Sequence, residues 1–327
     1  MSPPRITVAG AGSIGCFVGG LLADAGHDVR FLARPRVAAA CAADGLRLTD
    51  FDGLDVHLAA PAMIEDAEAA LSGADLVLVC VKSGDTNAMA RQIATHAPQA
   101  QVISLQNGVA NAVALRAALP QADVRAGVVP FNVVPGGPAQ YHRATSGDIL
   151  IEAGPLPDLS CPHLNWVQVD NIEAVQWGKL LINLGNAINA LSDMPLLEQL
   201  HDRRWRRLMA DQMAEGLRVL KTAGIAPAKT TAAPPHLIPH ILRLPTPLFR
   251  VIAAQMLTID AQARSSMWDD LKQGRKTEID ALQGAILELA SRHGRQAPLN
   301  ARMRSLIRTA EAAGEGPPGL RPDEIRQ

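Results

Sequence analysis

The 327-residue sequence lacks three features that mark particular classes of protein. It has no basic excess, because 31 Lys and Arg stand against 32 Asp and Glu, so broad neutralisation of nucleic-acid or membrane phosphates is not expected. Its cysteines form no C-x-x-C pair and no histidine stands at ligand spacing, which argues against a disulfide framework and a metal site. No apolar run approaches the roughly 18 residues that span a membrane, and nothing at the N-terminus reads as a signal peptide. We therefore expect a cytoplasmic protein with neither a nucleic-acid nor a membrane partner.

What is present describes an ordinary globular protein of two domains. Hydrophobic residues make up 48% of the chain and charged residues 19%, which is enough apolar material for substantial cores, and the length exceeds one average domain. Up to about Asp170, strand-like and helix-like runs alternate, which predicts an α/β domain with a right-handed, mostly parallel sheet. From Ala174 onward the segments are long and rich in Ala, Leu and Met, which predicts a bundle of helices. We place the domains at 1–170 and 171–327.

Several segments can be assigned within these halves. The continuous apolar runs 76–81 and 102–105 are typical of parallel strands that are covered on both faces. The runs 124–131 and 149–152 extend the sheet, and the Pro-Gly-Gly-Pro sequence at 135–138 predicts a turn between them. In the second half, the proline-rich stretch 227–247 indicates a long connection or broken helices.

The N-terminal strand runs directly into a G-x-G-x-x-G turn. Gly10 permits the tight turn, Gly12 lets the backbone approach a pyrophosphate, and Gly15 lets the next helix pack close to the sheet. The N–H groups at the start of that helix would hold the anion. A glycine turn that binds nothing is the alternative, but the strand that follows the helix completes a βαβ unit of the expected length. Cofactor contacts are therefore predicted at Gly10, Gly12, Ser13, Ile14 and Gly15.

The end of the second strand indicates which dinucleotide binds. An NAD-binding domain normally places Asp or Glu about 20 residues after the glycines, where the carboxylate accepts the ribose 2′-OH. This chain has Arg34 there, with Arg36 close behind. A guanidinium pairs with a 2′-phosphate, which a carboxylate would repel. The sequence therefore predicts NADP(H), the alternative being a solvated arginine in a surface loop.

Polar residues follow two further strands of the predicted sheet. Lys82 comes directly after the run 76–81, and Asn107 follows the run 102–105. The carboxyl ends of strands line the ligand crevice of an open α/β sheet, so both side chains would face the cofactor. Strand-terminal polar residues in ordinary turns are the alternative.

The helical half carries two further groups of polar residues. Lys179, Asn183 and Asn186 fall within a narrow arc of one helix face; buried against a ligand they would find polar partners, and otherwise they form a solvent-facing stripe. Further on, Ser266, Asp270 and Thr277 are expected to share a helix face, with Glu278 at its border. Alternatively, Thr277 and Glu278 simply start a helix, with the threonine as its cap.

Taken together, these motifs resemble the ketopantoate reductase family, also called 2-dehydropantoate 2-reductase, over essentially the whole chain. The resemblance implies NADPH-dependent reduction of a 2-oxo acid in pantothenate biosynthesis. It also implies a Rossmann domain followed by an all-helical domain like that of 6-phosphogluconate dehydrogenase. It is carried by the glycine motif with Arg34, by Val81-Lys82, Gln106-Asn107-Gly108, Trp177-Gly178-Lys179-Leu180 with Asn183, and by Ser265-Ser266-Met267 with Asp270 and Thr277-Glu278-Ile279-Asp280.

The resemblance also implies a role for each matching residue. Lys179 is similar to the general acid that protonates the carbonyl oxygen, and Glu278 to the acid near that lysine and the nicotinamide ribose. The remaining matches are polar contacts to the reacting centre (Asn107, Asn183), to the substrate carboxylate (Ser266) and to the cofactor (Lys82, Arg34, Asn107).

The chain departs from the family pattern at two substrate positions. Many members carry asparagines where this chain has Ala187 and Ala263, and Asn186 is the candidate to replace one of them. Three hypotheses follow: a ketopantoate reductase, a reductase of the same family for another 2-oxo or 2-hydroxy acid, and a non-catalytic NADP(H)-binding sensor. The presence of both Lys179 and Glu278 disfavours the sensor. The sequence leaves the oligomeric state open, with a homodimer as one candidate.

Overall fold

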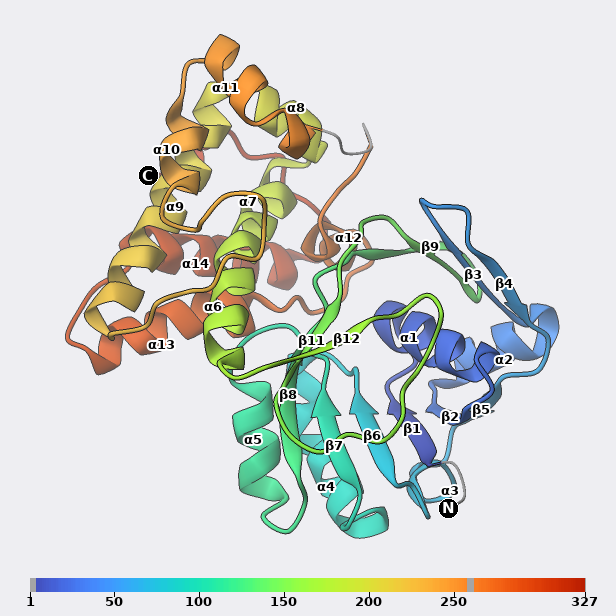
Figure 1. Ribbon diagram of the computed structural model, residues 1–327. Helices are drawn as coiled ribbons and strands as arrows, with labels where there is room; N and C mark the ends of the chain where they lie inside the picture. The colour runs from blue at the N-terminus through green and yellow to red at the C-terminus, as the bar shows by residue number, and fades with distance from the viewer. Residues whose placement is uncertain (1–3, 258–261, 327) are drawn as a thin grey trace. The chain divides into compact units, whose positions relative to one another are not determined.

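The computed structural model describes residues 4–257 and 262–326. The chain divides into two compact units, Met1–Ile172 and Glu173–Gln327. Strands and helices alternate in the first unit, whereas the described residues of the second form helices and loops only (Figure 1). The predicted fold class, an α/β domain followed by an all-helical one, is confirmed.

An eight-stranded sheet forms the centre of the first unit. Its strand order is β12-β11-β8-β7-β6-β1-β2-β5. All neighbours run parallel except β8 and β11, so the expected mostly parallel sheet is confirmed. The strands are β1 (Arg5–Ala9), β2 (Asp28–Leu32), β5 (Ala62–Ile64), β6 (Leu76–Val79), β7 (Gln101–Ser104), β8 (Val124–Val128), β11 (Ile149–Glu152) and β12 (Trp166–Val169).

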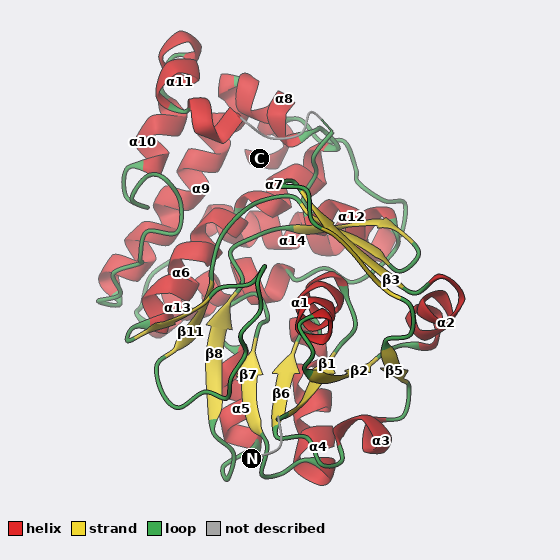
Figure 2. Ribbon diagram, turned by 45° about the vertical axis from the view of Figure 1, so that its right-hand side comes forward, coloured by secondary structure: helices red, strands yellow, loops and turns green. Residues whose placement is uncertain are grey.

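Helices cover this sheet on both faces, which explains why its strands are apolar throughout. In β6, Leu76 and Leu78 join the core that contains α1 (Ser13–Asp24). Val77 and Val79 join the opposite core, which contains residues of α4 (Thr86–His96) and α5 (Asn111–Ala118). Successive side chains of a strand point to opposite faces, so a strand between two cores must be apolar at every position. Figure 2 shows α1 on one side of the strands and α4 and α5 on the other.

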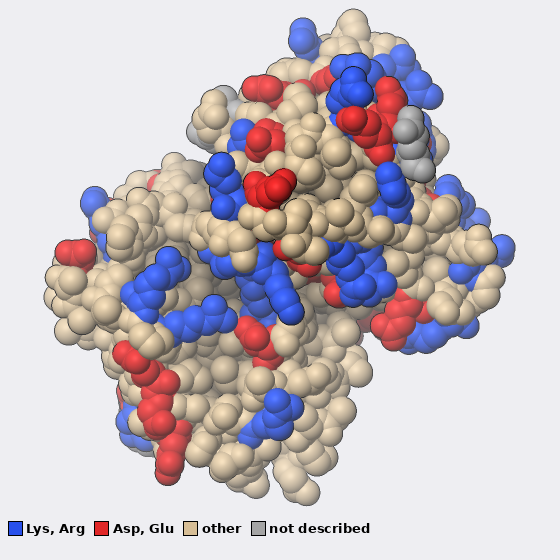
Figure 3. Space-filling model, turned by 180° about the vertical axis from the view of Figure 1, so that it is seen from behind, with Lys and Arg blue, Asp and Glu red and all other residues tan. Residues whose placement is uncertain are grey.

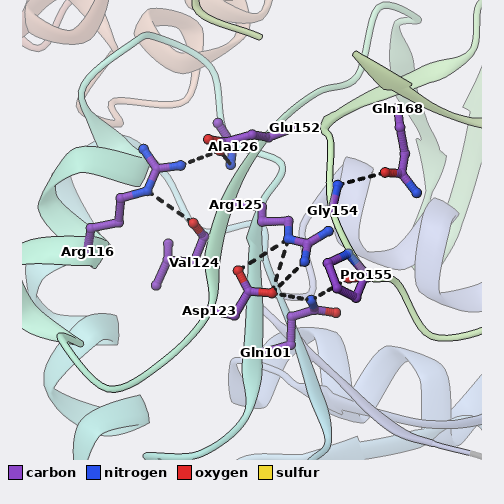
Figure 4. A network of polar contacts seen from close by, with 10 residues as sticks. All are labelled: Gln101, Arg116, Asp123, Val124, Arg125, Ala126, Glu152, Gly154, Pro155 and Gln168. Carbon is purple, nitrogen blue, oxygen red and sulfur yellow. Dashed lines mark hydrogen bonds and ion pairs between the residues drawn. The ribbon is translucent and has the colours of Figure 1, made fainter. Parts of the chain in front are cut away.

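A polar network surrounds the antiparallel strand pair β8 and β11 and its neighbours β7 and α5. Arg125, which is almost fully buried, donates from Nη2 to Asp123 at 2.6 Å, and Gln101 donates to the same carboxylate at 2.7 Å. Arg116 of α5 donates to the Val124 carbonyl at 3.0 Å and pairs with Glu152 of β11. Figure 4 shows these contacts joining α5, β7, β8 and β11.

A second, four-stranded sheet was not expected from the sequence. Its strand order is β4-β3-β10-β9. The predicted turn at 135–138 is wrong: Pro135 lies in β9, and the turn consists of Pro138 and Ala139. Proline is tolerated there because β9 is an edge strand. The strands are β3 (Leu46–Asp50), β4 (Asp55–Leu58), β9 (Val133–Gly137) and β10 (Gln140–Arg143).

The second unit is built from helices of very different length. Its longest is α9 (Arg203–Thr222), and the proline-rich stretch forms a loop followed by the short helices α10 (Ile238–Arg243) and α11 (Thr246–Ile252). That stretch was expected to be a connection or broken helices, and it contains both. The other helices are α6 (Ile172–Asn183), α7 (Gly185–Ser192), α8 (Leu196–His201), the 3₁₀ helix η2 (Ala254–Leu257), α12 (Ser266–Lys272), the π-helix η3 (Asp280–Gly284), α13 (Ala285–Arg292), α14 (Pro298–Ala313) and α15 (Pro322–Arg326).

Candidate active site

The glycine motif lies where β1 turns into α1, and its three glycines meet different surroundings. Gly10 has φ +113°, and a Cβ there would lie 2.8 Å from the Val81 nitrogen. A Cβ on Gly15 would lie 2.1 Å from the carbonyl oxygen of Gly10. A Cβ on Gly12 would meet nothing within 4 Å. Gly10 and Gly15 are therefore needed for the turn itself, whereas Gly12 borders open space.

The start of α1 suits an anion. Gly12 is the N-cap and has no side chain to cap the helix, and the first turn contains no acidic residue. Ser13 and Ile14, the first two residues of α1, are half-buried. The positive end of the helix dipole and the backbone N–H groups of this turn are therefore not neutralised by an acidic side chain of the turn itself. These residues fit the pyrophosphate of a dinucleotide.

Arg34 follows β2 and caps the next helix, α2 (Pro35–Asp44). Its side chain is 81% exposed and forms an ion pair with Asp85, with 3.2 Å between Nη2 and Oδ2. Sequence reasoning missed Asp85, which follows Lys82 by three residues in the 3₁₀ helix η1 (Ser83–Asp85). A bound 2′-phosphate would have to compete with this carboxylate for the guanidinium.

The segments that follow β6 and β7 lie side by side, as their parallel pairing predicts. Ser83, the residue after Lys82, donates a hydrogen bond from Oγ to the Asn107 carbonyl at 3.2 Å. Asn111 donates to the same carbonyl at 2.6 Å. The structure therefore places Lys82 and Asn107 at the ends of neighbouring strands. Both residues are half-buried.

A buried amide to which the sequence analysis assigned no role ties the same two segments together. Gln106 donates from Nε2 to the Val81 carbonyl at 2.9 Å and to Thr86 Oγ1 at 2.8 Å. The feature of the sequence that could have indicated a role for Gln106 was its position beside Asn107, directly after a strand. Gln106 thus fixes the backbone on which Lys82 and Asn107 are carried.

Lys179 lies on α6 in the second unit and is half-buried. Burial lowers the pKa of its ammonium group to about 8, and the negative charge of Glu278 partly opposes that shift. The preceding Gly178 allows another segment to cross the helix, since a Cβ there would lie 2.3 Å from the Ala228 carbonyl oxygen. The lysine is therefore charged at neutral pH but gives up its proton far more readily than a solvated lysine.

Thr277 and Glu278 do not share a helix with Ser266 and Asp270, so the expectation of one shared face is wrong. Helix α12 ends at Lys272, and the chain then turns through Gly274, whose φ is +62°. The alternative is correct in part: Thr277 and Glu278 precede the next helix, Thr277 Oγ1 accepts a hydrogen bond from the Ile279 nitrogen at 3.2 Å, and the Glu278 carbonyl accepts the bonds that open the helix. The N-cap residue of η3, however, is Ile279. Glycine in the left-handed region ends a helix without strain.

Asn186 and the start of α12 lie close together. The N-cap Ser265 donates from Oγ to the Asn186 carbonyl at 3.1 Å, and Ser266, the first residue of α12, is exposed. Asn183 and Asn186 are half-buried, whereas Ala187 is fully buried. Asn186 is therefore more accessible than the neighbouring alanine.

Two acidic residues of the motifs have structural partners instead. Asp270 accepts a hydrogen bond from Arg275 at 3.0 Å, and Asp280 pairs with Arg304 and Arg308. Basic and acidic side chains are intermingled on the face of the molecule shown in Figure 3. The described part of the chain contains no group of three or more His, Cys, Asp or Glu side chains placed to hold a metal ion. Within residues 4–257 and 262–326, no helix has the length and hydrophobicity needed to cross a bilayer.

Comparisons with known proteins cover both units. Residues 6–155 match the family model described as "Ketopantoate reductase PanE/ApbA", and residues 171–311 match its C-terminal counterpart. A 2-dehydropantoate 2-reductase of Halobacterium salinarum is 28% identical over 328 residues, which covers 95% of this chain and 100% of the relative. The solved PanE/ApbA family ketopantoate reductase of Ralstonia eutropha is 30% identical with a TM-score of 0.81, over 95% of this chain and 99% of that one. A D-mandelate dehydrogenase solved with NADH and anilino(oxo)acetate has the same fold, with a TM-score of 0.78 at 21% identity, over 95% and 99% of the chains.

Proposed function

The chain belongs to the ketopantoate reductase family, and we propose that it reduces 2-dehydropantoate to pantoate with NADPH. The family and the class of enzyme predicted from the sequence, an oxidoreductase, are confirmed by this membership. The observation that carries the proposed reaction is Lys179, a half-buried lysine whose pKa lies near 8 and whose charged neighbour is Glu278.

Lys179 has the properties that protonation of a reacting carbonyl needs. A nicotinamide cofactor, when bound, supplies the hydride. The carbonyl oxygen then gains negative charge, which an ammonium group stabilises and neutralises by donating a proton from Nζ. A pKa near the working pH lets the lysine release that proton and regain it from water. Glu278 would keep the buried lysine protonated at neutral pH, because its charge opposes the effect of burial.

The first unit supports the proposed cofactor. The open space beside Gly12 and the uncapped start of α1 suit a pyrophosphate, and Arg34 suits a 2′-phosphate. Lys82 and Asn107 would add contacts from the neighbouring strand ends. NADH is the competing cofactor, because the D-mandelate dehydrogenase of the same fold was solved with it.

Apart from Asn107, which the resemblance also assigns to the reacting centre, the proposed substrate contacts lie on the second unit. The polar groups of the 2-oxo acid would be bound by Asn183, Asn186 and Ser266. Asn186 would take over from the asparagine that many family members have at the position of Ala187. A site that hydrogen-bonds a substrate hydroxyl rejects analogues without it, whereas alanine at such positions cannot. We therefore expect ketopantoate to be preferred over 2-oxoisovalerate, which lacks the hydroxymethyl group, by less than the roughly 10⁴-fold typical of hydroxyl-binding sites.

The test is NADPH and NADH oxidation with a panel of 2-oxo acids that contains ketopantoate and 2-oxoisovalerate. The highest kcat/KM for ketopantoate with NADPH supports the proposal. High activity on another 2-oxo acid supports a different substrate within the family. Tight NADPH binding without oxidation on any acid would indicate the sensor. The homodimer stays a prediction, which light scattering of the purified protein checks.

A further inference from the structure

The helix that carries Lys179 is interrupted five residues further on. Helix α6 ends at Asn183 and α7 begins at Gly185, with Leu184 as a turn between them. The Leu184 nitrogen still donates to the Leu180 carbonyl at 3.0 Å. The Leu184 carbonyl, however, accepts a hydrogen bond from the side chain of Gln283, with 2.9 Å between Nε2 and the oxygen. A side chain that bonds into the helical ladder is a known cause of such interruptions.

Gln283 itself lies in an unusual element. It belongs to the π-helix η3, which begins two residues after Glu278. π-helices are rare, mostly a single turn long, and frequent at functional sites. Gln283 is fully buried, and its Oε1 has no hydrogen-bond partner among the described residues. A buried amide that is only half satisfied costs free energy that an apolar side chain of similar volume would avoid, so packing alone does not account for a glutamine here.

We propose that Gln283 is a positioning residue, which holds the helix bearing Lys179 in register with the segment bearing Glu278. The bond from Gln283 to Leu184 ties η3 to the end of the lysine's helix. On the other side of Glu278, the Thr277 nitrogen donates to Glu311 of α14 at 2.6 Å. Glu278 is thus held on both flanks, and the Gln283 bond joins its segment to the end of the lysine's own helix.

This inference rests on the proposed function for the roles of Lys179 and Glu278, but the property it concerns can be measured without turnover. Glu278 is the charged group that acts on Lys179 in the structure, and it raises the pKa of the lysine against the effect of burial. If the two segments drift apart, the Glu278 charge raises the pKa of Lys179 by less, whereas the burial of the lysine still lowers it. The pKa of Lys179 should then fall further.

The experiment compares Gln283→Met with the matched control Gln212→Met. Gln212 of α9 is almost fully buried, and neither its Oε1 nor its Nε2 has a hydrogen-bond partner among the described residues. Both variants remove a buried amide, but only the first removes a bond. The pKa of Lys179 is read from the pH dependence of its acetylation by acetic anhydride, followed by peptide mass spectrometry of the full-length protein.

We expect Gln283→Met to lower the titration midpoint of Lys179 by about one pH unit. It should also reduce kcat about 10- to 100-fold with the KM for NADPH unchanged, as a small misplacement of a reacting group does. Gln212→Met should change neither quantity. Should Gln283→Met fail to fold, Gln283→Asn keeps an amide that is one methylene too short to reach Leu184, and the same shift is expected.

Equal midpoints in the wild type and in the folded Gln283 variant overturn the inference, and so does an equal shift in Gln212→Met. If the wild type reduces ketopantoate and the midpoint does not move, the proposed function stands and Gln283 has no positioning role. If the midpoint moves but the wild type reduces no 2-oxo acid, Gln283 holds the pair and the proposed function fails.

Discussion

The first unit needs a glycine at position 15 of its G-x-G-x-x-G turn, and the second unit needs one at position 178 beside Lys179, but for different reasons. In the turn, the carbonyl that excludes a side chain from Gly15 belongs to Gly10, five residues away. Beside the lysine, the carbonyl that excludes a side chain from Gly178 belongs to Ala228, fifty residues away. The first requirement is local and appears as a spacing in the sequence. The second depends on how distant segments pack, so local spacing alone does not explain it.

The two regions also divide the proposed work between them. The groups around the glycine turn and Arg34 are suited to binding a dinucleotide, whereas Lys179 and Glu278 are suited to moving a proton. Variants in the first unit should therefore change cofactor affinity, and variants in the second should change turnover.

The largest effect is expected from Lys179→Ala. Loss of a general acid typically costs roughly 10²- to 10⁴-fold in rate, so kcat should fall by that factor while the Kd for NADPH changes little. Steady-state kinetics and fluorescence titration with NADPH measure the two quantities. Lys221→Ala, which removes an exposed lysine from α9, is the control. Near-normal kcat in Lys179→Ala would remove this lysine from the mechanism.

Arg34→Ala should weaken cofactor binding, whereas Lys179→Ala should lower kcat. A charge-assisted hydrogen bond contributes about 1.5–3 kcal/mol, so affinity for NADPH should fall about 10- to 100-fold and affinity for NADH should stay nearly constant. Asp85→Asn sharpens this test, because it removes the carboxylate that pairs with Arg34. An exposed ion pair contributes up to about 1 kcal/mol, so the NADPH affinity of this variant should rise by about fivefold at most. Equal weakening of both cofactors in Arg34→Ala would shift the assignment to Arg36.

The glycines of the turn separate folding from binding within the first unit. Gly15→Ala brings a Cβ against the Gly10 carbonyl oxygen at 2.1 Å, so the free energy of unfolding should drop by about 1–3 kcal/mol, as measured by urea denaturation. Gly12→Ala meets no atom within 4 Å and should unfold at nearly the wild-type urea concentration, yet bind NADPH more weakly. Equal NADPH affinity in Gly12→Ala and the wild type would show that no phosphate lies against this residue.

The pH dependence of turnover should report the pKa of Lys179 in the second unit. The pKa of Lys179 is lowered from 10.5 to about 8, and the protonated form is the one that donates. The rate of reduction should therefore be constant below about pH 7 and fall about tenfold by pH 9. Glu278→Gln removes the charge that raises this pKa, so its fall should begin at lower pH. A rate that stays constant up to pH 10 would contradict the assignment.

The sequence by itself was sufficient for several structural features that depend on residues close together in the chain. The glycine turn, the strand ends that carry Arg34, Lys82 and Asn107, and the change from strands to helices all follow from short-range spacing and periodicity. Parallel neighbours place their carboxyl ends at one edge, so even the proximity of Lys82 and Asn107 could be expected.

Only the tertiary structure decided the rest. The second sheet pairs β3 with β10, which lies about ninety residues further along the chain, and no local pattern specifies such a partner. The expected helix face from Ser266 to Thr277 was wrong because Gly274 ends the helix, and periodicity cannot show where a chain leaves helical geometry. The pKa of Lys179 and the bond from Gln283 to Leu184 arise from burial and from contacts about one hundred residues apart. Desolvation and long-range hydrogen bonds exist only once the chain is folded, so they cannot be read from the order of its residues.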